Sequence, residues 1–250
     1  MPTKTDTKSK PDPSGKSVTM SRRRLVMVGT IVATVVVAAA VLITAIVVGG
    51  KDNSKSAGGA VGNGSCTWTP FSQPTKLVTL PPGKVPTSGI VTVNLKTSQG
   101  PMTFTLDRAK APCTVASFVS LAGQGYFDNS PCHRVTTKGI FVIQCGDPSG
   151  YGTGNPGYFI PDEATGNETY PAGTIAMART SQPASGGSQF FIVYKDSPTL
   201  MRHLGMLQYT VFGTVTQGLD VAKKVGAAGA QTGDDGRPKL PLQLEKVTAN

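Results

Sequence analysis

Histidine is scarce in this chain, with only His133 and His203 among 250 residues. A hydrolase that activates a serine or cysteine nucleophile needs an imidazole base beside it, and many such enzymes carry the serine in a Gly-x-Ser-x-Gly turn. No such turn occurs in the sequence. The acidic residues Asp162 and Glu163 are adjacent, so a strand would turn them to opposite faces. These absences argue against a conventional hydrolase.

Patterns for binding nucleotides and nucleic acids are also lacking. The segment 14–17 ends like a phosphate-binding loop, but Lys10 stands where the leading glycine is required. The net charge is +10, yet seven of the 24 Lys and Arg residues lie in positions 1–24. The rest of the chain shows no basic stripe with interleaved aromatic residues. We therefore expect no nucleic-acid partner.

Charge is absent from one long stretch, residues 25–48, which is rich in Val, Ala and Ile. As a helix, this stretch is long enough to cross the bilayer core of about 30 Å. The preceding Arg22, Arg23 and Arg24 place the N-terminus in the cytoplasm by the positive-inside rule. A cleaved signal peptide is the alternative, although its apolar core is usually shorter. The sequence predicts a single-pass cell-membrane protein with its main domain outside the cytoplasm.

The composition changes along the chain predict its domain organisation. Residues 1–24 have little to bury and are expected to be a disordered basic cytoplasmic tail. After the transmembrane helix 25–48, the Gly- and Ser-rich segment 49–65 is typical of a flexible linker. Residues 66–88 are rich in Pro and Thr and are expected to form an irregular arm. Residues 89–250 form the functional domain.

Only four cysteines are present: Cys66, Cys113, Cys132 and Cys145. Their spacing matches none of the usual zinc ligand sets, so we expect no metal site. Outside the cytoplasm an even number fits two disulfides, and four cysteines allow three pairings. Cys132 and Cys145 lie across a hairpin, but strict strand alternation turns them to opposite faces unless a bulge intervenes. The pairing is therefore left open.

From residue 89 onward the pattern is mainly that of β-structure. Val91, Val93 and Leu95 alternate with polar residues, which predicts a strand with one buried face. A matching strand follows after a turn at 98–100. The other expected elements are helices at 111–122 and 219–225 and strands at 174–179, 189–194, 209–216 and 242–247. About eight strands and two helices in this order favour an antiparallel barrel or sandwich.

The stretch Cys132–Asp147, CHRVTTKGIFVIQCGD, contains the most informative polar residues. It predicts two short apolar strands joined by a turn near Lys138. Arg134 and Gln144 would then lie opposite each other and share a face with Val142. A guanidinium and an amide on an apolar hairpin are compatible with either an ordinary surface strand or a binding site.

Six motifs in register resemble the cyclophilin family of peptidyl-prolyl cis–trans isomerases across roughly residues 89–248. They are Tyr126-Phe127 with Cys132-His133-Arg134, Gln144-Cys145-Gly146-Asp147, Gly152-Thr153-Gly154, Ile175-Ala176-Met177-Ala178, Gly187-Ser188-Gln189-Phe190-Phe191 and Tyr209-Thr210-Val211-Phe212-Gly213. The resemblance implies a closed eight-stranded antiparallel barrel capped by two helices. It also implies that no cofactor is needed.

The resemblance assigns roles residue by residue. Arg134 corresponds to the catalytic arginine, and Gln144 to the amide that holds the substrate carbonyl. The expected walls of the proline pocket are Phe141, Phe191, Leu200 and Val142, the last standing where the family usually has Met. The expected peptide groove is lined by Ala178, Arg179 and Thr180, with Gly152 and Gln189 beside the neighbouring subsite.

Besides Val142, three positions depart from the family pattern. Arg179 stands where Asn is usual, and Tyr209 where many members have His. Thr199 replaces a Trp that helps to hold cyclosporin, so binding of that drug is expected to be weakened. The resemblance implies an isomerase that acts on proline-containing peptides and unfolded exported proteins and assists their folding. The alternative is a membrane-tethered proline-peptide binding module or chaperone with low turnover.

Overall fold

The computed structural model describes residues 63–197 and 208–250. The predicted tail 1–24, transmembrane helix 25–48 and nearly all of the linker 49–65 lie outside the described residues, as do Thr199 and Leu200. Of the helices in the described part, none is both long and apolar enough to cross a membrane.

The predicted β-hairpin is present at the start of the domain. Strands β2 (Ile90–Thr97) and β3 (Gly100–Asp107) pair without a shift from Ile90 opposite Asp107 to Thr97 opposite Gly100. Alternate side chains on β2 are buried, as the alternating sequence requires. Gly100 has a φ of 129° at the turn, which is a conformation that favours glycine.

Most strands join one curled antiparallel sheet in the order β11-β5-β6-β9-β8-β10-β3-β2-β12-β4. The remaining bounds are β4 Ser130–Pro131, β5 Arg134–Thr136, β6 Val142–Cys145, β8 Thr174–Met177, β9 Phe190–Val193, β10 Val211–Gln217, β11 Asp235–Gly236 and β12 Gln243–Ala249. A second sheet pairs β1 (Thr69–Pro70) with β7 (Tyr158–Phe159).

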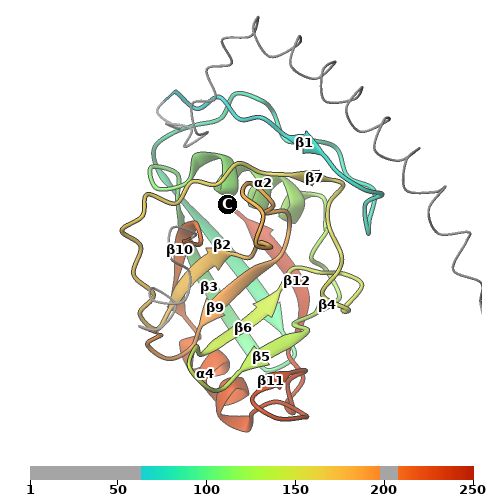
Figure 1. Ribbon diagram of the computed structural model, residues 1–250, viewed down its shortest axis with the longest axis vertical. Coiled ribbons are helices and arrows are strands. Elements are labelled where there is room, and N and C mark those ends of the chain that lie inside the picture. Colours follow the sequence, from blue (N-terminus) through green and yellow to red (C-terminus); the bar gives the residue numbers. More distant parts are fainter. Residues whose placement is uncertain (1–62, 198–207) are drawn as a thin grey trace, which may run out of the picture. The chain divides into compact units, whose positions relative to one another are not determined.

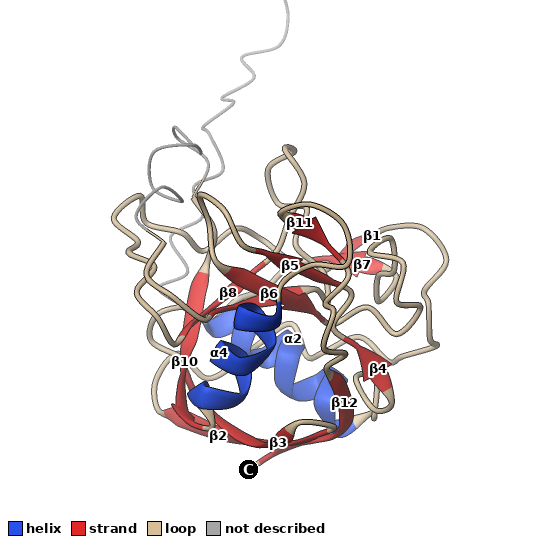
Figure 2. Cartoon of the chain, turned by 90° about the horizontal axis from the view of Figure 1, so that it is seen from below, coloured by secondary structure: helices blue, strands red, loops and turns tan. Residues whose placement is uncertain are grey.

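The closed eight-stranded barrel is corrected to an open, curled sheet. Ten strands form the large sheet, and among the described residues no hydrogen-bonded strand pair joins its ends, β11 and β4. Figure 2 shows the strands curling around the interior of the domain. The two edge strands, β4 and β11, have only two residues each, so pairing them to close the barrel would add few hydrogen bonds.

Two helices cover opposite ends of the curled sheet (Figure 1). Helix α2 (Pro112–Gly123) begins with a proline, which suits the first helical turn because its missing N–H needs no partner there. Its next two N–H groups, those of Cys113 and Thr114, donate to the buried Glu163 carboxylate at 2.8 and 2.7 Å. Helix α4 (Leu219–Ala228) ends three residues later than predicted.

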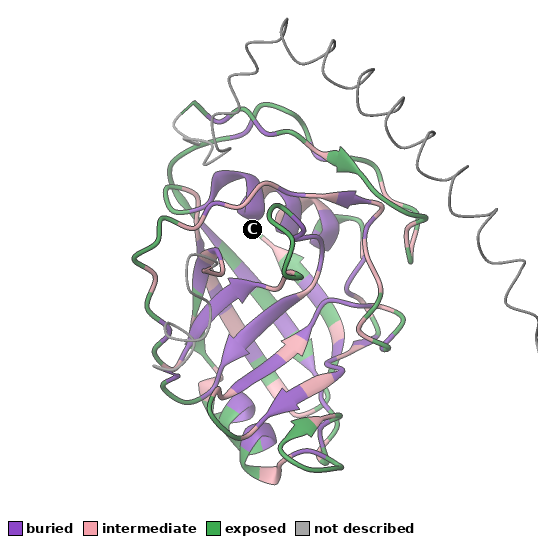
Figure 3. Cartoon of the chain, viewed as in Figure 1, coloured by how far each residue is buried: buried purple, intermediate pink, exposed green. Residues whose placement is uncertain are grey.

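The interior is filled by aromatic and aliphatic side chains from sheet and helices. Phe104, Phe118, Phe127, Phe190 and Phe212 are all buried and in ring contact with one another. Figure 3 shows that the buried residues of the strands continue into α2. This rigid core fixes the strands that carry the polar residues described below.

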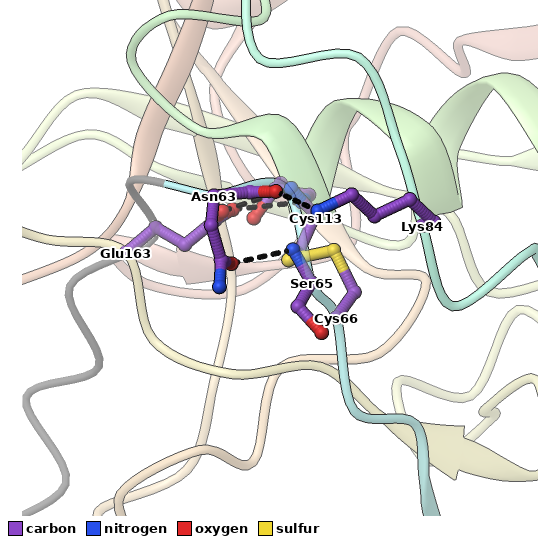
Figure 4. Close-up of a disulfide and its surroundings, with 7 residues drawn as sticks. Asn63, Ser65, Cys66, Lys84, Cys113 and Glu163 are labelled. Carbon is purple, nitrogen blue, oxygen red and sulfur yellow. Dashed lines mark hydrogen bonds between the residues drawn. A yellow bond between two sulfur atoms is a disulfide. The ribbon is translucent and has the colours of Figure 1, made fainter.

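Two disulfides settle the pairing that the sequence left open. Cys66 is bonded to Cys113, which ties the arm to α2 (Figure 4), and Cys132 is bonded to Cys145. Strand alternation argued against the bond between Cys132 and Cys145 on the assumption that Cys132 belonged to a continuous strand. Strand β5 begins at Arg134, so alternation does not reach Cys132, and its side chain is buried in the core.

Candidate active site

One cavity of about 460 Å³ contains most of the predicted site residues. Ten of the thirteen line it: Arg134, Val142, Gln144, Gly152, Ala178, Arg179, Thr180, Gln189, Phe191 and Tyr209. They come from strands β5, β6 and β9, from the segments just before β9, just after β8 and just before β10, and from the Gly-rich loop. Distant parts of the chain therefore meet as the resemblance implied.

Arg134 and Gln144 lie directly opposite each other on β5 and β6, which confirms the predicted register. Nη1 of Arg134 donates to Oε1 of Gln144 at 3.2 Å. Gln144 Nε2 donates in turn to Oε1 of Gln189 at 2.8 Å. Gln189 Nε2 donates to the carbonyls of Gly152 and Gly154 at 3.0 and 2.9 Å. A chain of amides thus runs from the guanidinium to the Gly-rich loop.

Asp235 holds the other edge of the Arg134 guanidinium. Nε and Nη2 of Arg134 donate to its two carboxylate oxygens, both at 2.7 Å. This hydrogen bond raises the pKa of Arg134 above its ordinary value and lowers that of Asp235. The arginine is therefore charged and held by a forked contact, which fixes its plane.

Sequence reasoning missed Asp235, which is 101 residues from Arg134. Asp235 lies in β11, where it pairs with Thr136 of β5. The local sequence, Asp234-Asp235-Gly236, has the appearance of an ordinary exposed turn. No periodic signal could have placed it beside Arg134.

The apolar side of the cavity is formed by Val142, Phe191 and Tyr209, with Ile140 packed against them. The rings of Phe191 and Tyr209 meet edge to face with centroids 5.0 Å apart. Apolar walls of this kind suit a small ring such as that of proline. Ile140 was not predicted as a wall residue.

Phe141, predicted as a wall of the proline pocket, is not among the residues that line the cavity. Its ring contacts Tyr194 at a centroid distance of 6.1 Å, and Nζ of Lys195 lies 4.5 Å from its centre. Strand β6 begins at Val142, so strand alternation does not decide which way the Phe141 side chain points.

Arg179 is folded back along the wall rather than extended into solvent. Its side chain is only 4% exposed, and its Nε lies 3.9 Å from a carboxylate oxygen of Asp162. The guanidinium carbon is 6.0 Å from the centre of the Tyr209 ring. Two departures from the family pattern, Arg179 and Tyr209, thus meet in one place.

The Gly-rich loop is organised by the buried carboxylate of Asp147. It accepts hydrogen bonds from the N–H groups of Ser149, Gly152 and Gly154 at 2.8, 2.7 and 3.0 Å. Burial alone would raise the pKa of Asp147, but the hydrogen bonds from the Ser149 side chain and from these N–H groups outweigh it and hold the pKa below its usual value. Asp147 is therefore an ionised loop anchor.

His133 lies under this loop rather than in the cavity. It is buried, and neither ring nitrogen has a hydrogen-bond partner. A Cβ placed on Gly152 would lie only 3.2 Å from its Cδ2, so the ring packs closely against the loop. Burial lowers the pKa of His133 and favours the neutral ring.

An open, curled sheet carrying an arginine, an amide chain and an apolar cavity defines a cyclophilin-like peptide site. Residues 92–249 match the model of the cyclophilin-type peptidyl-prolyl cis-trans isomerase family. The chain belongs to this family. Since the match covers more than half of the chain, the assignment does not depend on any single motif.

Named relatives agree with the family assignment. Over 201 residues the chain is 40% identical to a probable peptidyl-prolyl cis-trans isomerase B of Mycobacterium leprae and 42% identical to that of Mycobacterium tuberculosis. Each match takes in 73% of this chain, and it spans 66% and 63% of the two relatives' lengths. The Bacillus subtilis peptidyl-prolyl cis-trans isomerase B is 46% identical over 123 residues, which is 49% of this chain and 80% of that protein.

A solved structure shares the fold. The crystal structure of a Cryptosporidium parvum cyclophilin-type isomerase in the presence of the dipeptide Ala-Pro has a TM-score of 0.55 and 26% identity. The match covers 64% of this chain and 98% of that structure.

Proposed function

We propose that this chain accelerates cis–trans isomerisation of X–Pro peptide bonds and that its substrates are exported or envelope proteins. The observation that carries the proposal is the fixed guanidinium of Arg134 in a cavity whose apolar wall suits a proline ring. Membership of the family and the printed names of the relatives support the activity. The proline-containing dipeptide in the Cryptosporidium structure supports the class of ligand.

The geometry suits the chemistry of the reaction. Rotation about a peptide bond is opposed by amide conjugation, with a barrier of about 18–20 kcal/mol. When the bond is twisted, conjugation is lost and the prolyl nitrogen gains a localised lone pair. A guanidinium directed at that nitrogen stabilises the twisted state more than the planar one, which lowers the barrier. Val142 and Phe191 would hold the ring while Gln144 holds the carbonyl.

We also propose that the domain lies outside the cytoplasm, anchored in the lipid bilayer through residues 25–48. The long uncharged stretch and the arginines before it support this topology. The two disulfides support it independently, because disulfides persist mainly in oxidising compartments. Protease treatment of bacterial spheroplasts that express the chain tests the location. Digestion of the domain in intact spheroplasts is expected, and full protection would contradict the topology.

The isomerase activity is tested on the full chain in detergent, with an Ala-Pro peptide followed by NMR exchange. Arg134→Ala is expected to lower kcat/KM by about 100-fold, because one strong electrostatic contact to the transition state is lost. The matched control is Arg108→Ala, which removes an arginine that does not line the cavity. Unchanged turnover in folded Arg134→Ala would overturn the proposal.

A second candidate is a proline-peptide binding module or chaperone with low turnover. It is favoured by Arg179, whose guanidinium carbon lies 6.0 Å from the centre of the Tyr209 ring at a position where the family usually has Asn. Peptide affinity and turnover measured on one sample separate the two functions: tight binding with negligible acceleration supports the second. In the same assay we expect cyclosporin to inhibit only weakly, because Thr199 replaces the usual Trp.

A further inference from the structure

Two aromatic side chains that the family resemblance does not include lie at the same cavity. Phe71, from the arm, and Phe159, from β7, both line it together with Arg134. Their ring centroids are 4.1 Å apart, with the planes inclined by 30°. Phe71 is 50% exposed, so half of its surface is open to solvent.

The backbone on both sides holds Phe71 in place. Thr69 and Pro70 pair with Phe159 and Tyr158, and the N–H of Phe71 donates to the carbonyl of Gly157 at 2.9 Å. The arm continues along the Gly-rich loop. There the N–H of Thr75 donates to the carbonyl of Asn155 at 2.9 Å, and the N–H of Asn155 donates to Thr75 Oγ1 at 3.0 Å.

Two further contacts anchor the arm to the domain. The disulfide from Cys66 to Cys113 ties its start to α2. Nζ of Lys76 donates to the carbonyls of Tyr126 and Asp128 at 2.9 and 3.0 Å. Phe71 therefore stands between two fixed points, and its ring is presented to the cavity at a small entropic cost for any ligand that binds it.

The charge around this end of the cavity is also informative. Arg134 and Arg179 are the only charged residues among those that line the cavity in the described part of the chain. Gly152, Thr153, Gly154 and Asn155 of the Gly-rich loop line the same cavity and are all uncharged. An apolar aromatic pair with no neighbouring counter-charge favours an uncharged apolar side chain.

We propose that Phe71 and Phe159 form an aromatic shelf, a second subsite that binds an aromatic or large aliphatic side chain of the same peptide whose proline lies beside Arg134. The inference rests on the proposed function for the identity of the peptide. The shelf and the proline pocket belong to one cavity. A single peptide could therefore occupy both. Phe159 lies within residues 92–249, which match the family model, whereas Phe71 lies before the match begins.

The test uses the full chain in detergent and a set of Ala-Pro peptides in which one Ala is replaced by Phe at each position up to four residues from the proline. Binding is measured by fluorescence anisotropy and turnover by NMR exchange. At one position Phe is expected to improve Kd and kcat/KM by about fivefold over Ala, in line with one aromatic contact. A uniform response at all positions would overturn the shelf.

Substitutions at Phe71 test whether the preference for Phe in the peptide depends on the shelf. In Phe71→Ala, the Phe-containing and Ala-containing peptides are expected to bind about equally well. Phe71→Trp should retain the preference for Phe. Leu77→Ala is the matched control, because Leu77 is on the same arm, is 91% exposed and does not line the cavity. A preference that survives in Phe71→Ala would overturn the shelf. Should Phe71→Ala not fold, Phe71→Leu replaces it and is expected to weaken the Phe preference relative to Phe71→Trp.

The binding measurement separates this inference from the proposed activity. Selective binding that depends on Phe71, with no turnover of any peptide, would support the shelf and contradict the isomerase. Turnover without selectivity would support the isomerase and contradict the shelf.

Discussion

Arg134 and Asp235 form a forked ion pair at the cavity, with both N–O distances at 2.7 Å. The pair joins the strand that carries the guanidinium to a two-residue strand about 100 residues later. Asp235 is not among the described residues that line the cavity, and its carboxylate accepts hydrogen bonds from Arg134. Its contribution to the reaction is therefore to orient Arg134, which makes it a positioning residue.

Removing that carboxylate is expected to slow the reaction without unfolding the domain. Asp235→Asn should lower kcat by about 10- to 100-fold, because a guanidinium free to rotate is misplaced relative to the prolyl nitrogen. KM should change little, since the apolar walls are intact. Steady-state kinetics on Ala-Pro peptides measure both.

The neighbouring Asp234→Asn is the matched control for this prediction. Asp234 is exposed, and its carboxylate lies 3.9 Å from Nζ of Lys138 instead of near Arg134. Asp235→Glu should recover part of the lost kcat. Equal losses in Asp234→Asn and Asp235→Asn would show that the turn matters and the ion pair does not.

His133 predicts how stability depends on pH. Burial lowers its pKa below the ordinary 6.5, so in the window below pH 6.5 the unfolded chain binds a proton that the folded chain does not. Above about pH 6.5, the contribution of His133 to the free energy of unfolding should not change with pH. It should fall below that pH by up to about 1.4 kcal/mol per pH unit. Denaturant titrations between pH 5 and 8 measure this slope.

Comparison of variants isolates the contribution of His133. The groups that face it are Asp147, Arg134, Arg237 and Gln189. The carboxylates with lowered pKa titrate in a more acidic range, but the raised pKa of Glu163 contributes with the opposite sign above its ordinary 4.5. His133→Gln should therefore abolish the fall in stability below pH 6.5 and leave only the opposite contribution of Glu163. A slope unchanged in His133→Gln would refute the assignment.

The two disulfides should differ in what their removal costs. In the chain-entropy model, the 47-residue separation of Cys66 and Cys113 corresponds to about 4 kcal/mol, and the 13-residue separation of Cys132 and Cys145 to about 3 kcal/mol. Replacing each pair by Ala and measuring unfolding in urea tests this order. Only the loss of the first pair should also weaken the preference for Phe in peptides, because it releases the arm. Loss of that preference in both variants would argue against a separate role for the arm.

Gly154 is the position where an added methyl group does most harm to the loop. A Cβ there would lie 1.8 Å from Oδ1 of Asp147 and 2.7 Å from Oγ1 of Thr75. Gly154→Ala should therefore destabilise the domain by at least about 1–3 kcal/mol and lower activity. Gly123→Ala, where nothing lies within 4 Å, is the matched control and should be neutral in thermal melts. Similar melting temperatures for the two variants would contradict the loop geometry.

Local sequence patterns were sufficient for the parts of the fold that depend on neighbouring residues. Alternation predicted β2, and a turn near Lys138 predicted that Arg134 would face Gln144. The start of α2 was within one residue of its prediction, because a proline marks it. These features follow from side-chain period and turn chemistry, which act over a few residues.

The same patterns failed where the chain leaves regular strands. Strict alternation argued against joining Cys132 to Cys145, and it was wrong because Cys132 precedes β5. The family pattern placed Phe141 in the pocket wall, whereas the residues that line the cavity at this point are Ile140 and Val142.

What the sequence by itself determined is the hairpin that presents a guanidinium and an amide on one face, together with the family to which it belongs. The tertiary structure decided what holds and surrounds them. Asp235 lies about 100 residues after Arg134 and binds its guanidinium. Phe71 lies about 60 residues before Arg134 and lines the same cavity. Such contacts depend on the packing of the whole curled sheet and on a disulfide to the arm. No local pattern encodes them, because the free energy that brings these segments together comes from burial of the shared core.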